Sequence, residues 1–145
     1  MDARQIELVR RSFARVVPIR AEAAALFYQR LFALDPDTCA LFRGDIAAQG
    51  AKLMAALSTV VHALDRLDTV AGKVRALARR HVHYGVDERH YATVGAALLW
   101  TLEQGLGPDE FTPEVRDAWS TAYALLSGAM IQAAREEMMA SLGAD

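Results

Sequence analysis

The histidine at position 81 has the residue type and spacing of a metal ligand. Val74, Leu77 and Ala78 precede it at intervals that place all of these residues on one face of a helix. His83 lies about 200° further round the same helix and is expected to face solvent. Taken alone, an inward histidine is most simply a core residue that hydrogen-bonds to the backbone. It is also what an iron cofactor needs when the cofactor supplies the remaining ligands.

A zinc site is the other metal centre that the histidines suggest. His81, His83 and His90 would be its ligands, but His81 and His83 diverge on one helix, and no cysteine or carboxylate converges with them. Cys39 is the one cysteine of the chain, which excludes an internal disulfide and fits a reducing compartment. A haem is less demanding, since it supplies four nitrogen ligands and needs a single axial histidine.

Two polar side chains are expected to point inward from two other helices. Tyr28 is the polar member of an apolar stripe that includes Leu31, and Gln49 lies one turn before Leu53 on a buried face. Singly, each is more simply a tyrosine with its hydroxyl at the surface or a solvated residue near a helix start. Together with His81, both are explained by one cofactor held between them, because buried polar groups need partners.

Helical periodicity runs through the whole chain, and no segment has the alternation of a strand. Aspartates at positions 2, 45, 68 and 87 are predicted N-caps, and Thr112 caps a helix that begins with proline. The prediction is one all-α domain over residues 1–145 with about seven helices. Their expected ranges are 3–17, 20–35, 36–42, 46–64, 69–84, 88–104 and 113–142.

Composition excludes several classes of partner. Hydrophobic residues make up 53% of the 145, but no apolar run approaches the ~20 residues that span a bilayer, so we expect no membrane partner. The net charge is −2 and the basic residues are spread along the sequence, so we expect no nucleic acid. The charged N-terminus has no apolar leader, which predicts a cytoplasmic protein.

Three stretches in the same order carry a resemblance to a known family. They are FYQRLFALDP with LF (27–36 and 41–42), ARRHVHYGV with HYATVGAALLW (78–86 and 90–100), and DAWSTAY (117–123). Together they resemble the globins, and specifically bacterial single-domain haemoglobins, the globin domain of flavohaemoglobins and neuroglobin-like chains. The resemblance extends from about Ile6 to about Glu136 and implies a globin fold that encloses one haem b.

The resemblance also implies roles for individual residues. His81 matches the proximal iron ligand, while Tyr28 and Gln49 match the distal polar pair that faces a bound gas. Leu53 matches the apolar distal residue that follows this glutamine. The predicted cofactor contacts are Phe42, Lys52, Leu53, Leu77, Val86 and Tyr91.

One position departs from the flavohaemoglobin pattern. Where that pattern has a glutamate that supports the proximal side through Tyr91, this chain has Ala134. Glu136 and Glu137 lie nearby but on other faces of the helix. The proximal charge relay is therefore expected to be missing, which favours ligand binding over peroxidase chemistry.

The predicted function is reversible binding of O2, and also of CO and NO, at a five-coordinate iron, for storage, delivery or sensing. His62 lies too far along its helix, and on the wrong face, to be a sixth ligand. The alternative is an enzyme, a nitric oxide dioxygenase, whose iron a separate reductase would re-reduce. A third possibility is a haem-free globin-fold signalling module. We expect a monomer or a weak homodimer.

Overall fold

The computed structural model describes residues 1–42 and 44–143, and these form an all-helical fold without a strand, as predicted. Six α-helices are joined by short connections, three of which are 3-10 helices at Val17–Ile19, Pro36–Leu41 and Leu67–Val70. The expected helix over 36–42 is therefore a 3-10 helix. The α-helices are α1 (Ala3–Val16), α2 (Arg20–Leu34), α3 (Ile46–His62), α4 (Ala71–His83), α5 (Glu88–Leu106) and α6 (Pro113–Gly143).

Three of the predicted aspartate caps are confirmed. The Asp2 carboxylate accepts the Gln5 N–H at 2.8 Å, and the side chain of Gln5 accepts the Asp2 N–H in return. The carboxylate of Asp45 accepts from the N–H of residue 47 at 3.0 Å, and that of Asp87 from the N–H of residue 89 at 3.1 Å. Caps of this kind stabilise a helix by about 1 kcal/mol each and fix where α1, α3 and α5 begin.

The predicted cap at Asp68 is wrong. Asp68 lies inside the 3-10 helix Leu67–Val70, and α4 begins only at Ala71, without a side-chain cap. The 3-10 turn satisfies its own backbone, since the N–H of Thr69 donates to the Arg66 carbonyl at 3.0 Å. A helix that continues from such a turn has less need of a capping carboxylate, because fewer of its first N–H groups are left unpaired.

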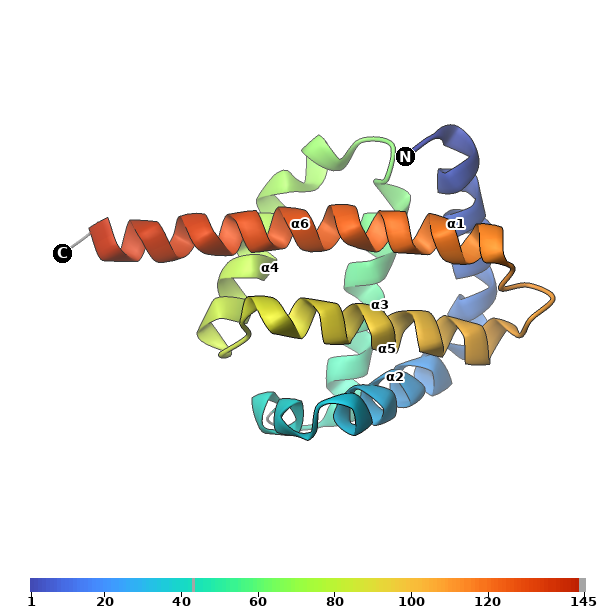
Figure 1. The fold of residues 1–145 in the computed structure, drawn as a ribbon, viewed down its shortest axis with the longest axis horizontal. Coiled ribbons are helices and arrows are strands. Elements are labelled where there is room, and N and C mark those ends of the chain that lie inside the picture. The colour runs from blue at the N-terminus through green and yellow to red at the C-terminus, as the bar shows by residue number, and fades with distance from the viewer. Residues whose placement is uncertain (43, 144–145) are drawn as a thin grey trace.

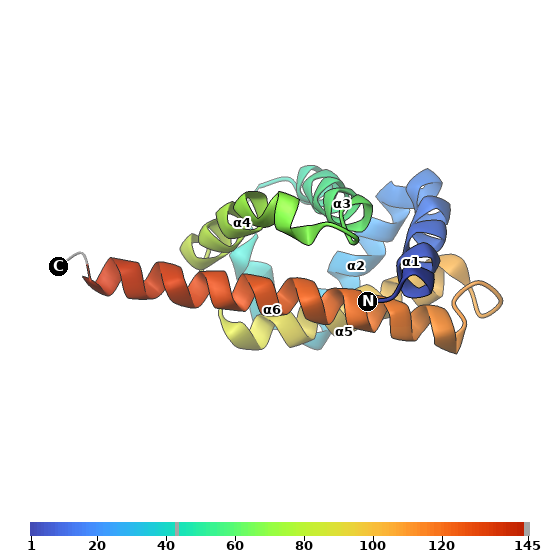
Figure 2. The same cartoon turned by 90° about the horizontal axis from the view of Figure 1, so that it is seen from above.

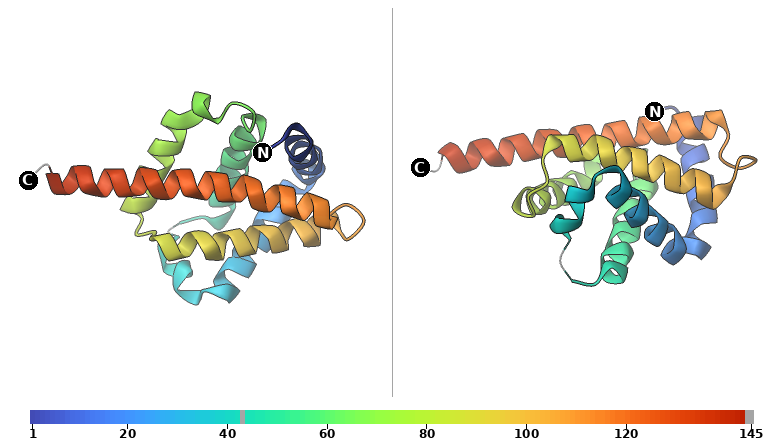
Figure 3. Two further views of the ribbon diagram at one scale, coloured as in Figure 1. Left: turned by 45° about the horizontal axis from the view of Figure 1, so that its top comes forward. Right: turned by 60° about the horizontal axis from the view of Figure 1, so that its bottom comes forward.

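The longest helix, α6, contacts three of the other helices, α1, α4 and α5 (Figure 1). α1 packs against its first half and α4 against its second half, while α5 runs beside it. α2 packs against both α5 and α3 on the other side of the molecule (Figures 2 and 3). No helix in the described residues is long and apolar enough to cross a membrane.

The buried side chains form two clusters instead of one continuous core. The larger joins α1, α2, α3, α5 and α6, and within it the Trp119 indole N–H donates to the Ser12 hydroxyl at 2.8 Å. The smaller joins α4, the start of α5 and the second half of α6. Leu126 on α6 packs against both. The buried members of the smaller cluster are Ala78, Tyr91, Met130 and Ala133.

α2 and α3 cross in close contact at Gly50. A Cβ atom added to Gly50 would lie 2.8 Å from the Cβ of Ala24 and 3.8 Å from Cε2 of Tyr28. The first distance is below any normal carbon–carbon contact, so the crossing requires a residue without a side chain on α3. This crossing places Gln49, the neighbour of Gly50, beside the helix that carries Tyr28.

We predict that Gly50→Ala destabilises the protein by about 1–3 kcal/mol, because the new methyl group forces the two helices apart. The matched control is Gly128→Ala on α6, where an added Cβ meets nothing within 4 Å. There the substitution is expected to stabilise by about 0.4–1 kcal/mol through the unfolded chain. Urea unfolding of both variants measures the difference, and equal effects at the two positions would contradict the close crossing.

Candidate functional site

His81 is half-buried on α4 and has a fixed orientation. Its Nδ1 lies 2.8 Å from the Leu77 carbonyl oxygen. Because a carbonyl oxygen can only accept, Nδ1 carries the proton, and Nε2 keeps its lone pair for another partner. Burial lowers the pKa of His81, the Leu77 hydrogen bond opposes that shift, and the charge of Arg80 adds to it. The side chain is therefore a neutral imidazole, the form that binds a metal ion.

Tyr91 lies alongside the His81 ring. Their ring centroids are 6.5 Å apart and their planes differ by 19°, so the two rings are nearly parallel. The hydroxyl of Tyr123 on α6 donates to the backbone carbonyl of Tyr91. Gly95 makes this contact possible, because a Cβ there would lie 2.6 Å from Cε1 of Tyr123. α6 thus holds the start of α5, and with it Tyr91, against α4.

Tyr28 on α2 is 5% exposed and lies within a group of aromatic rings. Its centroid is 5.2 Å from that of Phe27, 6.0 Å from Phe32 and 5.1 Å from Phe42. No group in the described residues hydrogen-bonds to its hydroxyl. Burial raises the pKa of Tyr28 to about 12, so the hydroxyl keeps its proton at neutral pH and is a hydrogen-bond donor. In the described residues Arg30 Nε is the fully buried polar side-chain atom without a hydrogen-bond partner, so the Tyr28 hydroxyl keeps some accessible surface, where it can donate to water or to a ligand.

The α3 residues predicted for the site differ in burial. Gln49 and Leu53 are half-buried, and Leu53 packs against the larger cluster. Lys52 is exposed. The side chain of Gln49 has no hydrogen-bond partner in the part of the chain that the structure describes. The structure therefore groups Tyr28, Phe42 and Leu53 around the larger cluster, with Gln49 beside the α2–α3 crossing.

The other histidines are engaged elsewhere or exposed. His83 faces solvent as predicted, and the exposed His62 places its Nδ1 2.7 Å from the Ser58 carbonyl oxygen. His90 is 5% exposed, and its Nδ1 accepts the Asp87 N–H at 3.0 Å, which completes a capping box. That role was missed from sequence, although the spacing of Asp87 and His90 is that of a capping box. No group of three His, Cys, Asp or Glu residues able to hold a metal ion occurs within 1–42 and 44–143.

Tyr123 is the second residue near the site that sequence reasoning did not single out. It lies one turn after the buried Trp119, which is the signal that would have placed it on the inward face. Position 134 on α6 is a half-buried alanine. Of the two nearby acids, Glu137 pairs with Arg79 at 3.2 Å, and Glu136 accepts from Gln132 at 3.2 Å.

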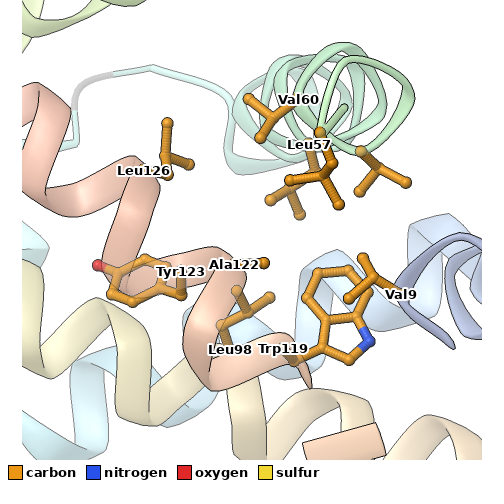
Figure 4. A pocket seen from close by; sticks show the side chains of 10 residues that line it. Val9, Leu57, Val60, Leu98, Trp119, Ala122, Tyr123 and Leu126 are labelled. Carbon is orange, nitrogen blue, oxygen red and sulfur yellow. The ribbon is translucent and has the colours of Figure 1, made fainter. Parts of the chain in front are cut away.

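An apolar pocket lies between α1, α3, α5 and α6 (Figure 4). Leu57 and Val60 reach into it from α3, facing Ala122, Tyr123 and Leu126 on α6 (Figure 4). The pocket lies within the larger cluster, and neither His81 nor Tyr28 lines it.

The residues present fit a flat apolar cofactor with one axial ligand. His81 offers a ring nitrogen that the Leu77 hydrogen bond leaves unused, and Tyr28 offers a hydroxyl without a hydrogen-bond partner in the described residues. Several large apolar side chains at the edges of the two clusters are only half-buried, as expected where a further apolar group completes the packing. They are Phe42, Leu53, Leu57, Leu77 and Val86.

Comparison with known proteins identifies the family. The globin family model matches residues 25–130, and the chain belongs to the globin family, which confirms the resemblance drawn from the sequence. An uncharacterized globin-like protein of Aquifex aeolicus is 36% identical over 110 residues, which cover 76% of this chain and 77% of that protein. Neuroglobin of Danio rerio is 31% identical over 137 residues, or 85% and 86% of the two chains.

A third relative is much longer. The flavohemoprotein of Vibrio cholerae is 32% identical over 108 residues, which are 72% of this chain but 27% of that protein. Among solved structures, an engineered carbene transferase from a candidate nitric oxide dioxygenase of Rhodothermus marinus has a TM-score of 0.85 at 26% identity, covering 100% and 99% of the two chains. A bacterial globin of Campylobacter jejuni has a TM-score of 0.86 at 23% identity, covering 94% and 99%. Membership of the family implies a haem and small gaseous ligands.

We predict that the haem-free protein loses stability as the pH falls below the ordinary histidine value of 6.5, in part through His81. Its pKa is lowered by folding, so between the folded and unfolded values the unfolded chain binds more protons and is favoured. Above 6.5 this contribution is fully present. His81→Gln should flatten the pH dependence of the unfolding free energy over this window, whereas His83→Gln, at an exposed position, should not. Identical slopes for the wild type and His81→Gln would contradict the burial of this ring.

Proposed function

We propose that this globin holds one haem b through His81 and reversibly binds O2, and also CO and NO, at a five-coordinate iron. The observation that carries the proposal is that one polar group of His81 and one of Tyr28 have no hydrogen-bond partner in the described residues. The Nε2 of His81 is left free by the Leu77 hydrogen bond, and the hydroxyl of Tyr28, a residue that is 5% exposed, has no hydrogen-bond partner in the described residues. Haem supplies an iron with one open position for a diatomic ligand, whose outer atom becomes partly negative.

Tyr28 and Gln49 are the donors that select a polarised ligand. A hydrogen bond to a group with negative charge contributes about 1.5–3 kcal/mol, and ~1.4 kcal/mol is tenfold in affinity. The rings of Phe32 and Phe42 lie 6.0 and 5.1 Å from the Tyr28 ring, centroid to centroid, and make its surroundings apolar. O2 therefore gains more than the less polar CO, and a tight complex that releases O2 slowly is the expected result.

The remaining predicted contacts position the cofactor. Leu77, Val86 and Tyr91 belong to the smaller cluster beside His81 and supply its apolar surface on that side. The exposed Lys52 is free to reach a carboxylate at the cofactor's edge. With alanine at position 134, no carboxylate on α6 replaces the Leu77 carbonyl as the partner of the imidazole. His81 is then a neutral ligand without added negative charge behind it.

The second candidate function is a nitric oxide dioxygenase. It is favoured by the names of relatives, a flavohemoprotein and a candidate nitric oxide dioxygenase, the latter similar over the whole of this chain. The same residues would serve both functions, because a donor such as Tyr28 that holds O2 also holds it for reaction with NO. Turnover differs from storage in one requirement, which is a supply of electrons to the iron after each cycle.

We predict that His81→Gly abolishes the five-coordinate spectrum of the haem-loaded protein and that added imidazole restores it. The glycine variant leaves space for free imidazole to occupy the position of the missing ring. Hemin titration followed by absorption spectroscopy, with and without imidazole, measures this. His83→Gly is the matched control and should bind hemin as the wild type does. An unchanged spectrum in His81→Gly would refute the assignment of the iron ligand.

We predict that Tyr28→Phe raises the O2 dissociation rate by at least about tenfold, since loss of one charge-assisted bond removes about 1.5–3 kcal/mol. CO dissociation should change much less. Stopped-flow displacement of O2 by CO gives the rate. Tyr84→Phe, at a tyrosine that is 61% exposed, is the control with the same chemical change. If both variants release O2 at the wild-type rate, Tyr28 does not contact the ligand.

A further inference from the structure

The charged side chains on the exposed face of α4, the helix that carries His81, are all positive. α4 contains Lys73, Arg75, Arg79 and Arg80 and no acidic residue. All four are exposed, as is His83, while Val74, Leu77, Ala78 and His81 occupy the opposite face. Since the whole chain has a formal charge of −2, the residues outside α4 together carry −6. Four of the sixteen lysines and arginines thus lie on α4, and no acidic residue of the same helix offsets them.

Helix stability does not account for this face. Cations are favourable near a helix C-terminus and unfavourable in the first turn, where they oppose the helix dipole. Arg80 and His83 lie in the last turn and gain from it. Lys73 is the third residue of α4, far from the C-terminal turn in which a cation gains from the helix dipole. Arg75 follows two residues later, on the same exposed side.

Most of the acidic residues near the exposed face of α4 already form ion pairs with arginines. Glu137 on α6 pairs with Arg79 at 3.2 Å. Glu88 at the start of α5 accepts two hydrogen bonds from Arg135, at 2.5 and 2.9 Å, and Asp87 pairs with Arg89 at 3.2 Å. Asp68, in the 3-10 helix before α4, is exposed and forms no ion pair in the described residues. No ion pair within the described residues involves Lys73, Arg75 or Arg80.

We propose that the outer face of α4 is the docking surface for an acidic electron-donor protein that reduces the iron held by His81. The proposal rests on the proposed haem site. α4 lies at the edge of the molecule, so that a partner can approach it directly (Figures 1 and 2). One electron passes from the donor's reduced flavin or iron–sulfur centre, which is oxidised by one electron, to the ferric iron, which becomes ferrous.

Position favours an electron donor over other acidic partners. The basic face and His81 lie on opposite sides of one helix, whose diameter with side chains is about 10–12 Å. A redox protein bound there is separated from the imidazole by α4 alone. Complementary charge also raises the rate of encounter, by about 10–10³-fold at low salt.

The test uses the haem-loaded full chain and an acidic flavodoxin, reduced beforehand, as the probe. Stopped-flow absorption measures the rate at which the ferric protein becomes ferrous, at ionic strengths of about 0.01 M and 1 M, between which the Debye length falls from ~30 Å to ~3 Å. At low salt, Lys73→Glu with Arg75→Glu should slow reduction about tenfold. At high salt the difference from the wild type should disappear. Both positions are exposed and form no ion pair in the described residues, so this variant is expected to fold.

The control is Arg11→Glu with Arg20→Glu, which makes the same change in net charge on α1 and α2. It should be reduced at nearly the wild-type rate, and dithionite should reduce all three proteins alike. A second readout does not depend on the iron, because retention on immobilised flavodoxin should fall for the α4 variant both with and without haem.

Two results would overturn the docking surface, namely equal slowing by both double variants or no effect of either. Stronger retention of the wild type on phosphatidylserine vesicles or duplex DNA than on flavodoxin would also overturn it. Failure of the haem proposal is recognised separately, because the wild type would then show no Soret band and no O2 binding before any donor is added.

Discussion

α2 and α3 approach so closely at Ala24 and Gly50 that their separation is set by the missing side chain of the glycine. The geometry of the candidate gas site depends on this contact. Tyr28 lies one turn after Ala24, and Gln49 immediately precedes Gly50, so the crossing brings the two polar side chains to adjacent helices. A larger residue at position 50 would move α3 away from α2, and hydrogen bonds from both helices to one small ligand would weaken steeply with the added distance.

The buried side chains form two separate clusters, and each has half-buried apolar side chains at its edge. The larger cluster ends at Phe42 and Leu53, the smaller at Leu77 and Val86, and all four of these side chains are half-buried. Apolar side chains of this size are normally buried deeply in a domain of 145 residues. Their partial exposure on two facing sets of elements is consistent with a fold whose core is completed by an apolar cofactor. On this view the haem contributes to stability as well as to ligand binding.

The sequence predicted those features that depend on local chemistry. The aspartate caps at positions 2, 45 and 87 follow from spacing within one turn, and the inward and outward orientations of His81 and His83 follow from helical geometry. Asp68 has the same local pattern and is not a cap, because a 3-10 turn precedes the helix. The contact of Tyr123 with the Tyr91 carbonyl joins residues 32 positions apart, so no local pattern could reveal it.

The environment of His81 determines which chemistry the site supports. Burial and the charge of Arg80 both disfavour the imidazolium, and the Leu77 carbonyl holds the Nδ1 proton without removing it. A carboxylate in that position would give the ring anionic character and increase its donation to the metal. Position 134 on α6 is an alanine, Glu137 is engaged by Arg79, and no carboxylate within the described residues hydrogen-bonds to the His81 ring. In the proposed haem site this ligand would stay neutral and would place no added negative charge on the iron, so the proposed dioxygenase turnover would depend on how rapidly a donor supplies electrons.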